Sequence, residues 1–201
     1  MKGKLGVVVL AAGASQRLGQ PKQLLPWKQG TLLEYVVDMA LAVAGEPVFV
    51  VLGAERELIQ PVLPATVKVV ANPHWREGVA SSIRESVETL ERLYPESRGV
   101  LFLSCDQPLV RGDHLRKMLA LFQRSEKTIM AATYAGTTGI PVIFSRCWFP
   151  TLRNLKGDQG AKVILRKNTN DVATLSLPEA QWDIDDWETY HRLQSKVMSE
   201  G

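Results

Sequence analysis

Two kinds of hydrophobic pattern alternate along this chain. Short runs of apolar, often β-branched residues are separated by longer stretches in which apolar residues recur every three or four positions. The short runs are typical of buried strands, and the longer stretches are typical of amphipathic helices. Strands are therefore predicted over residues 5–10, 47–53, 67–71, 99–105, 128–134 and 141–145, with a weaker pattern over 172–177.

Two of the helical stretches begin with a capping signal. Thr31 and Glu34 have the spacing of a capping box, in which each side chain bonds the other residue's backbone N–H group, and apolar residues follow over 33–44. Ser82 and Glu85 repeat this spacing before a second amphipathic stretch. The pattern makes Thr31 and Ser82 the predicted N-caps of two helices.

Further helices are predicted over residues 115–122 and 186–197, the last with Asp186 as its N-cap. The alternation of strands and helices implies crossover connections, which build a mostly parallel sheet with helices on both faces. No linker, repeat or low-complexity segment interrupts the pattern. The prediction is one three-layered α/β domain over residues 1–201, with ligands bound at the carboxyl ends of the strands.

The composition is that of an ordinary globular protein. Of the 201 residues, 45% are hydrophobic and 22% are charged, which excludes a disordered chain, a collagen and a coiled coil. The formal net charge of +3 is too small to argue for a nucleic-acid partner. The distribution of charge says more, because five Lys or Arg residues precede the first acidic residue, Glu34. This basic start predicts an anionic ligand near the N-terminus.

The cysteines and the N-terminal residues bear on where the protein works. Cys105 and Cys147 make no disulfide framework, and no Cys/His spacing is typical of a zinc site. The apolar run after Lys2 and Lys4 resembles a signal peptide, but it is short and cationic residues follow it closely, so a buried strand is favoured. No run approaches the ~20 apolar residues of a membrane span. We expect a cytoplasmic protein with no membrane partner.

The loop after the first predicted strand has the parts of a phosphate-binding cradle. It is neither a Walker A loop nor a dinucleotide-binding G-x-G-x-x-G motif. Small residues at 11–13 leave backbone N–H groups accessible to an anion. Arg17 offers a planar fork for phosphate oxygens, and Lys22 offers a point charge. By its spacing alone, the segment is equally well a surface turn with two solvated cations.

The full string L-A-A-G-x-S-x-R-x-G-x-P-K-x-L-L-P over residues 10–26 resembles the signature of nucleotidyltransferases. These enzymes have a GT-A-like, Rossmann-related fold of the nucleotide-diphospho-sugar transferase type, and the string is most similar to the molybdenum cofactor cytidylyltransferase branch. The resemblance implies that Arg17 and Lys22 bind the triphosphate and act in catalysis. The residues that it places against the base and ribose, through their backbone, are Leu10, Ala11, Ala12 and Gly13.

A second segment, with Gly78, Ser81 and Ser82, selects the base in this resemblance. The branch that uses CTP has Ser here, as this chain does, whereas the guanylyltransferase branch typically has Pro and Gly. That branch also has Gly in place of Ala12. Both differences favour cytidine, and a base contact of Ser82 is compatible with its predicted capping role. Trp75, just upstream, is expected to pack or to lie in a loop.

Two aspartates are the candidate metal ligands. Asp106 directly follows the predicted strand 99–105, where ligands bind in this fold class, although a lone Asp before Gln107 and Pro108 is more often a turn residue. The resemblance implies that Asp106 is catalytic and binds Mg²⁺ together with Asp185. The chain departs from the usual pattern in having Cys105 where Gly is common and Asp186 where Thr is common. Asp186 therefore either strengthens the attraction for metal or only caps the last helix.

Two further segments match the acceptor side of the cleft in the resembling enzymes. Their shared residues are Gly139, Pro141, Gly157, Asp158 and Gly160. Independently of the resemblance, the glycines around Asp158 are typical of a turn that opens a helix. The N-terminus of such a helix would also suit the acceptor's phosphate.

Together these features predict an Mg²⁺-dependent transfer of CMP from CTP to the terminal phosphate of a molybdopterin-type acceptor, with release of pyrophosphate. The resemblance also implies a molybdenum hydroxylase apo-enzyme as a partner. One alternative is a guanylyl- or sugar-phosphate nucleotidyltransferase on the same fold. Another is a non-catalytic molybdenum cofactor chaperone, which would keep the loop and lose the metal site. The presence of both Asp106 and Asp185 favours the enzyme.

Overall fold

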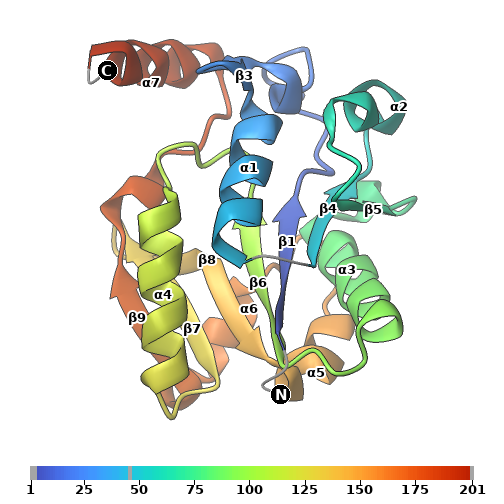
Figure 1. The fold of residues 1–201 in the computed structure, drawn as a ribbon, viewed down its shortest axis with the longest axis vertical. Helices are drawn as coiled ribbons and strands as arrows, with labels where there is room; N and C mark the ends of the chain where they lie inside the picture. Colours follow the sequence, from blue (N-terminus) through green and yellow to red (C-terminus); the bar gives the residue numbers. More distant parts are fainter. Residues whose placement is uncertain (1–3, 45–46, 200–201) are drawn as a thin grey trace.

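The computed structural model describes residues 4–44 and 47–199 of the chain. A seven-stranded sheet with the order β5-β4-β1-β6-β8-β7-β9 forms its centre (Figure 1). Only β8 runs against the other strands of this sheet, because it pairs antiparallel with both β6 and β7 while every other pairing is parallel. The strands are β1 (Leu5–Leu10), β4 (Val48–Leu52), β5 (Lys68–Ala71), β6 (Gly99–Ser104), β7 (Ile129–Tyr134), β8 (Thr137–Ser145) and β9 (Val172–Ser176).

All seven predicted strands are confirmed, and β8 is longer than predicted. It begins at Thr137 rather than at residue 141, because β7 turns back directly through Ala135 and Gly136. Both turn residues have positive φ, 45° and 72°, which is the geometry of a tight hairpin turn. The polar residues that open β8 pair with Thr133 and Tyr134, although they carry no hydrophobic signal of a strand.

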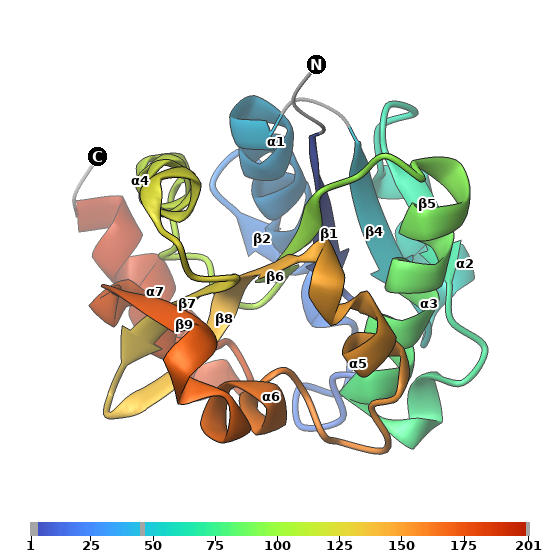
Figure 2. The same cartoon turned by 90° about the horizontal axis from the view of Figure 1, so that it is seen from below.

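Helices cover both faces of the sheet, as predicted. On one face, α1 (Leu32–Ala44) and α4 (Gly112–Arg124) pack on alternate strand residues such as Val7 and Val9. On the other face, α3 (Val79–Leu93), α5 (Phe149–Arg153) and α6 (Lys162–Lys167) pack on residues such as Val8. Figure 2 shows α1 and α4 on one side of the sheet and α5 and α6 on the other. None of the described helices is long and apolar enough to cross a membrane.

The last helix, α7 (Trp187–Ser199), packs away from the sheet on a small third cluster of apolar residues. This cluster includes Trp27 and Leu32, which belong to or follow a two-stranded hairpin of β2 (Pro26–Trp27) and β3 (Gly30–Thr31). The hairpin and the short α2 (Arg56–Ile59) were not predicted, because two to four residues give no periodic signal. The hairpin sets the end of the 10–26 motif against the C-terminal helix.

Two of the three predicted caps are confirmed. The Thr31 N–H group donates to Glu34 Oε2 at 2.7 Å, and the Glu34 N–H group donates to Thr31 Oγ1 at 3.2 Å. Asp186 Oδ1 accepts from the Thr189 N–H group at 2.8 Å. The predicted cap at Ser82 is wrong, because α3 already begins at Val79.

Gly78 occupies the N-cap position of α3 instead. Its φ is +116°, and a Cβ atom there would collide with Asp158 and the Gly157 backbone. The helix therefore starts where the chain passes closely under the 157–158 loop. Ser82 and Glu85 lie within the helix, where the three-residue spacing of a capping box recurs without marking an end.

Candidate active site

A cleft of about 690 Å³ opens at the carboxyl ends of β1 and β6. The two strands end side by side, with Leu10 opposite Ser104, so that the loops after them form two walls of the cleft. A second cavity of about 280 Å³ adjoins it and shares Asp106, Ile140 and Asp158. This is the edge of the sheet at which the sequence predicted ligand binding.

The loop after β1 is held from behind by a buried glutamine. Gln23 is 0% exposed, and its Nε2 donates to Ala11 O at 2.7 Å and to Gly13 O at 3.0 Å. Ser15, with φ of 52°, accepts from the Lys22 N–H group at 3.0 Å. These bonds tie the start of the loop to its end. Sequence reasoning missed Gln23, since a polar residue beside Lys22 in a loop is ordinarily solvated.

The backbone of this loop is equipped to bind an anion. No described residue accepts a hydrogen bond from the N–H groups of residues 13–17, and these residues line the cleft. The loop carbonyls of Ala11 and Gly13, by contrast, are engaged by Gln23. A run of free N–H donors beside Arg17 and Lys22 suits phosphate oxygens.

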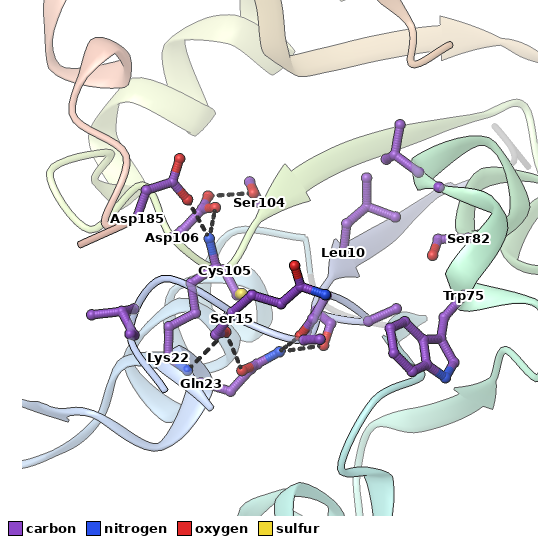
Figure 3. A pocket seen from close by; sticks show the side chains of 18 of the residues that line it. Leu10, Ser15, Lys22, Gln23, Trp75, Ser82, Ser104, Cys105, Asp106 and Asp185 are labelled. Carbon is purple, nitrogen blue, oxygen red and sulfur yellow. Dashed lines mark hydrogen bonds and ion pairs between the residues drawn. The ribbon is translucent and has the colours of Figure 1, made fainter. Parts of the chain in front are cut away.

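Lys22, Asp106 and Asp185 converge at one end of the cleft (Figure 3). Lys22 Nζ lies 2.6 Å from Asp106 Oδ2 and 2.9 Å from Asp185 Oδ1, and it also donates to Ile184 O at 3.3 Å. Asp185 Oδ2 accepts from Arg17 at 2.7 Å. The structure thus brings together four of the residues that the sequence proposed for the triphosphate and the metal.

Backbone geometry fixes the two aspartates relative to each other. Asp106 follows β6, and its carboxylate accepts from the Ser104 hydroxyl. The Ile184 N–H group donates to Asp106 O at 2.9 Å, which holds the segment before α7 against the end of β6. Asp185 is therefore positioned by its neighbour in the chain, and Asp186 is left to cap α7.

The ionic cluster shifts the titration of its members. Burial disfavours a charged ammonium, but Asp106 and Asp185 outweigh this effect and hold the pKa of Lys22 above its ordinary value. Partial burial likewise disfavours the Asp185 carboxylate, and the contacts with Lys22 and Arg17 still hold its pKa below the usual range. Both partners therefore stay charged at neutral pH.

Two neighbouring groups have pKa values that are shifted so as to favour their neutral forms instead. Burial, together with the charge of Asp106, raises the pKa of Asp183 to about 6. Burial raises the pKa of the Cys105 thiol to about 12, so this sulfur stays protonated. Cys105 is 2% exposed and takes the role of a small core residue.

The carboxylate pair fits a divalent cation. Asp106 and Asp185 point their oxygens at one common position, which Lys22 Nζ holds here. Among the described residues there is no cluster of three or more His, Cys, Asp or Glu side chains that could hold a metal ion. A metal at this point would take two protein oxygens and fill its remaining positions with phosphate oxygens and water, which is the coordination that Mg²⁺ prefers.

The opposite end of the cleft is formed by α3 and by the segment that precedes it. Ser82 and Val79 from α3 line it together with Trp75, which packs against Gly53. Ser81 does not line the cleft, because it is 0% exposed and its hydroxyl donates to Gly78 O at 2.8 Å. The residue that sequence reasoning treated as packing, Trp75, is therefore also a wall of the cleft.

The residues that the sequence proposed for binding the acceptor substrate divide into two groups. Gly139, Asp158 and Gly160 line the second cavity. Pro141 lies within β8, and Gly157 faces α3, where its carbonyl accepts from the Ala80 N–H group at 3.1 Å. Further residues of this cavity that the sequence did not single out are Gln107, Tyr134 and Lys162.

The MobA-like NTP transferase domain matches residues 7–172 of the chain. The chain belongs to this family. Over 190 residues it is 26% identical to the purine catabolism protein PucB of Bacillus subtilis, with 90% of each chain covered. Over 140 residues it is 26% identical to the molybdenum cofactor cytidylyltransferase of Escherichia coli, with 69% of each chain covered.

Solved structures of similar proteins have the same fold. The crystal structure of Rv0371c from Mycobacterium tuberculosis superposes with a TM-score of 0.83 at 32% identity, covering 97% of this chain and 100% of that one. A second crystal structure of that protein is a complex with manganese, with a TM-score of 0.77 at 28% identity and the same coverage. This MobA-like chain is a nucleotidyltransferase enzyme, as its sequence predicted, with the Rossmann-like α/β architecture that the motif implied.

Proposed function

We propose that this MobA-like enzyme transfers CMP from CTP to the phosphate of a molybdopterin-type acceptor and releases pyrophosphate. The observation that carries the proposal is the cleft itself. It joins a loop of free N–H donors, the cations Arg17 and Lys22, and the carboxylate pair Asp106 and Asp185. A triphosphate and a divalent cation are the ligands that use all three features together.

The acceptor's chemistry explains the absence of a dedicated base from the proposed mechanism. A phosphate monoester has a second pKa of ~6 and is largely a dianion at neutral pH, so it needs no deprotonation before it attacks. The barrier lies in bringing two anions together and in stabilising the charge on the leaving pyrophosphate. Positioning and electrostatics therefore supply the catalysis.

Each part of the site has a role in this reaction. The N–H groups of residues 13–17 and the side chain of Arg17 hold the triphosphate, and Lys22 neutralises the charge of the departing pyrophosphate. Asp106 and Asp185 hold Mg²⁺. When bound, this ion supplies charge neutralisation at the phosphoryl oxygens. The manganese complex of Rv0371c supports a divalent ion in this fold.

The end of the cleft lined by Ser82 and Trp75, called the base end below, has residues that support cytidine as the nucleoside. Ala12 and Ser82 both line it, and both match the residues of the CTP-using branch. Ser81 supports α3 from behind the cleft, and Gly78 allows the close approach of the 157–158 loop. The name of the Escherichia coli relative agrees with this choice. Guanylyl transfer on the same fold is the competing function. An assay that compares CTP with GTP distinguishes the two functions.

The acceptor would occupy the second cavity, which meets the first at Asp106. Gly139, Asp158 and Gly160 would contact it directly, while Pro141 and Gly157 would shape the cavity from β8 and from the loop against α3. The proposal extends to a molybdenum hydroxylase apo-enzyme that receives the dinucleotide product.

A pyrophosphate-release assay tests the proposal. Each of the four NTPs is supplied with MgCl₂, with and without molybdopterin cofactor, and Asp106→Asn serves as the inactive control. We expect release only with CTP and the cofactor together. Release with GTP in place of CTP would make the protein a guanylyltransferase, and no release with any pair would overturn the assignment of substrates.

A further inference from the structure

Asn72 is a buried side chain at the base end of the cleft to which the proposed reaction assigns no role. It directly follows β5 and is 2% exposed. Its Nδ2 lies 2.8 Å from Ser81 Oγ and 3.0 Å from Ser82 Oγ, so that one amide reaches both serines. Its backbone N–H group donates to Leu52 O at 2.8 Å, which fixes the residue to the neighbouring strand β4.

The orientation of this amide follows from its other end. Asn72 Oδ1 accepts from the His74 N–H group at 2.9 Å, and a backbone N–H group can only donate. The atom facing the serines is therefore the NH₂ group, which can only donate as well. Both serine oxygens must act as acceptors toward Asn72, and each hydroxyl proton must point elsewhere.

The two protons have different destinations. Ser81 donates its proton to Gly78 O at 2.8 Å, inside the protein. Within residues 4–44 and 47–199 the Ser82 hydroxyl donates no hydrogen bond, and Ser82 lines the cleft. Figure 3 shows Ser82 beside Trp75, at the end of the cleft away from Asp106 and Asp185. The Ser82 hydroxyl is thus a hydrogen-bond donor aimed at whatever occupies this end.

We infer that Asn72 is a specificity-determining positioning residue, which fixes the Ser82 hydroxyl as a donor toward an acceptor edge of the nucleobase. The inference rests on the proposed function in placing the base at this end of the cleft. Cytosine offers two adjacent acceptors, O2 and N3, to such a donor. On the corresponding edge of guanine, N1–H and N2–H donors take the places of these two acceptors and would face the Ser82 proton without a bond, while the one acceptor of that edge, O6, takes the place of the cytosine amino group. Asn72 therefore selects against guanine although it does not touch the base.

Binding measurements with three probes test this inference. Calorimetry in the presence of MgCl₂ gives the affinities of CTP, GTP and tripolyphosphate, the last of which has no base. The variants are Asn72→Ala, Asn72→Asp, Ser82→Ala and the double variant Asn72→Ala with Ser82→Ala. Ser86→Ala is the matched control, because Ser86 is a buried serine of the same helix whose hydroxyl donates to Ile83 O and does not line the cleft.

We expect Asn72→Ala and Ser82→Ala each to reduce the ratio of CTP to GTP affinity by about tenfold, the worth of one hydrogen bond. The double variant should lose no more than either single variant, since both act through the same bond. Asn72→Asp should also reduce the ratio, because its carboxylate accepts the Ser82 proton and turns it from the cleft. Tripolyphosphate affinity should be unchanged in every variant, and Ser86→Ala should match the wild-type enzyme.

Two different results would contradict two different claims. An unchanged CTP-to-GTP ratio in Asn72→Ala, or equal losses for tripolyphosphate and CTP, would overturn the role of Asn72. A wild-type preference for GTP would overturn the cytidylyl assignment instead. If circular dichroism shows that the Asn72 variants do not fold, Ser82→Ala alone tests the inference. An unchanged CTP-to-GTP ratio in Ser82→Ala would show that the Ser82 hydroxyl is not a selective donor to the base, and the inference would be wrong.

Discussion

Replacing Lys22 by methionine removes the cation that two carboxylates share, while a flexible side chain of similar length still fills the space. The Lys22 side chain is 13% exposed and that of Asp106 is 16% exposed, so this pair is largely desolvated. Removing one partner of a buried ion pair costs about 3–5 kcal/mol. Asp185 is 39% exposed and keeps Arg17 at 2.7 Å, so we expect a smaller loss of about 2–3 kcal/mol in the free energy of unfolding.

Thermal unfolding with and without MgCl₂ measures this loss. For a chain of this size each kcal/mol lowers Tm by roughly 2–4 °C, so Lys22→Met should unfold about 4–12 °C below the wild-type protein. Mg²⁺ should raise Tm more in the variant than in the wild-type protein, because the ion meets two carboxylates and displaces no ammonium. Turnover should nevertheless fall by roughly 100-fold or more, as for the loss of one oxyanion donor.

Lys28→Met is the matched control, since it removes an exposed lysine from the same part of the chain. It should change stability by less than about 0.5 kcal/mol and leave the Mg²⁺ effect as in the wild-type protein. An equal Mg²⁺-dependent shift of Tm in Lys22→Met and in the wild-type protein would refute the reasoning. The carboxylates of Asp106 and Asp185 would then not share one cation position.

Three other substitutions probe separate parts of the enzyme. Asp106→Asn should abolish turnover and weaken the Mg²⁺ effect on Tm, whereas an unchanged Mg²⁺ titration would make Asp106 a turn residue. Gln23→Glu should weaken the binding of all four NTPs and of tripolyphosphate by a similar factor of about 5 to 100, since it removes two hydrogen bonds to the loop. Glu77 pairs with Arg84 and accepts from the Gly157 N–H group, and its pKa is lowered to about 2. A lowered pKa stabilises the folded state above the ordinary pKa of 4.5, and this stability is lost as the pH falls toward 2. Urea unfolding should therefore separate wild-type protein from Glu77→Gln at pH 7 and bring them together near pH 2; a constant difference would exclude the carboxylate's role.

The sheet was predictable because its strands are buried on both faces. Residues such as Val7, Val8 and Val9 are all at most 1% exposed, and a strand without a polar face appears in the sequence as a continuous apolar run. The start of β8 was not predictable in this way, since Thr137 and Thr138 are paired strand residues outside the core. The wrong cap at Ser82 has a similar cause. A Ser and a Glu three residues apart can both lie within a helix, so this spacing alone does not mark an N-terminus. The close approach of the 157–158 loop to Gly78 decides where α3 begins.

The site was predictable to the extent that its residues lie in motifs. Lys22 and Arg17 were found by their string, and Asp106 by its place after a strand. Asp185 was proposed from the resemblance alone, because no local pattern says that the segment before α7 returns to the end of β6. That return is held by contacts between residues far apart in the sequence, among them the backbone hydrogen bond from Ile184 to Asp106 and the packing of α7 against the β2–β3 hairpin.

Gln23 and Asn72, the two buried amides that sequence reasoning missed, have the same physical role at different places in the cleft. Gln23 engages loop carbonyls and leaves N–H donors for the phosphates, while Asn72 engages serine oxygens and leaves one O–H donor for the base. In each case a buried amide occupies acceptors so that donors face the ligand. The phosphates are common to all nucleotides and the base is not. A Gln23 variant should therefore change every nucleotide's affinity alike, an Asn72 variant should change their ratio, and the two effects should add, since the amides share no hydrogen-bond partner.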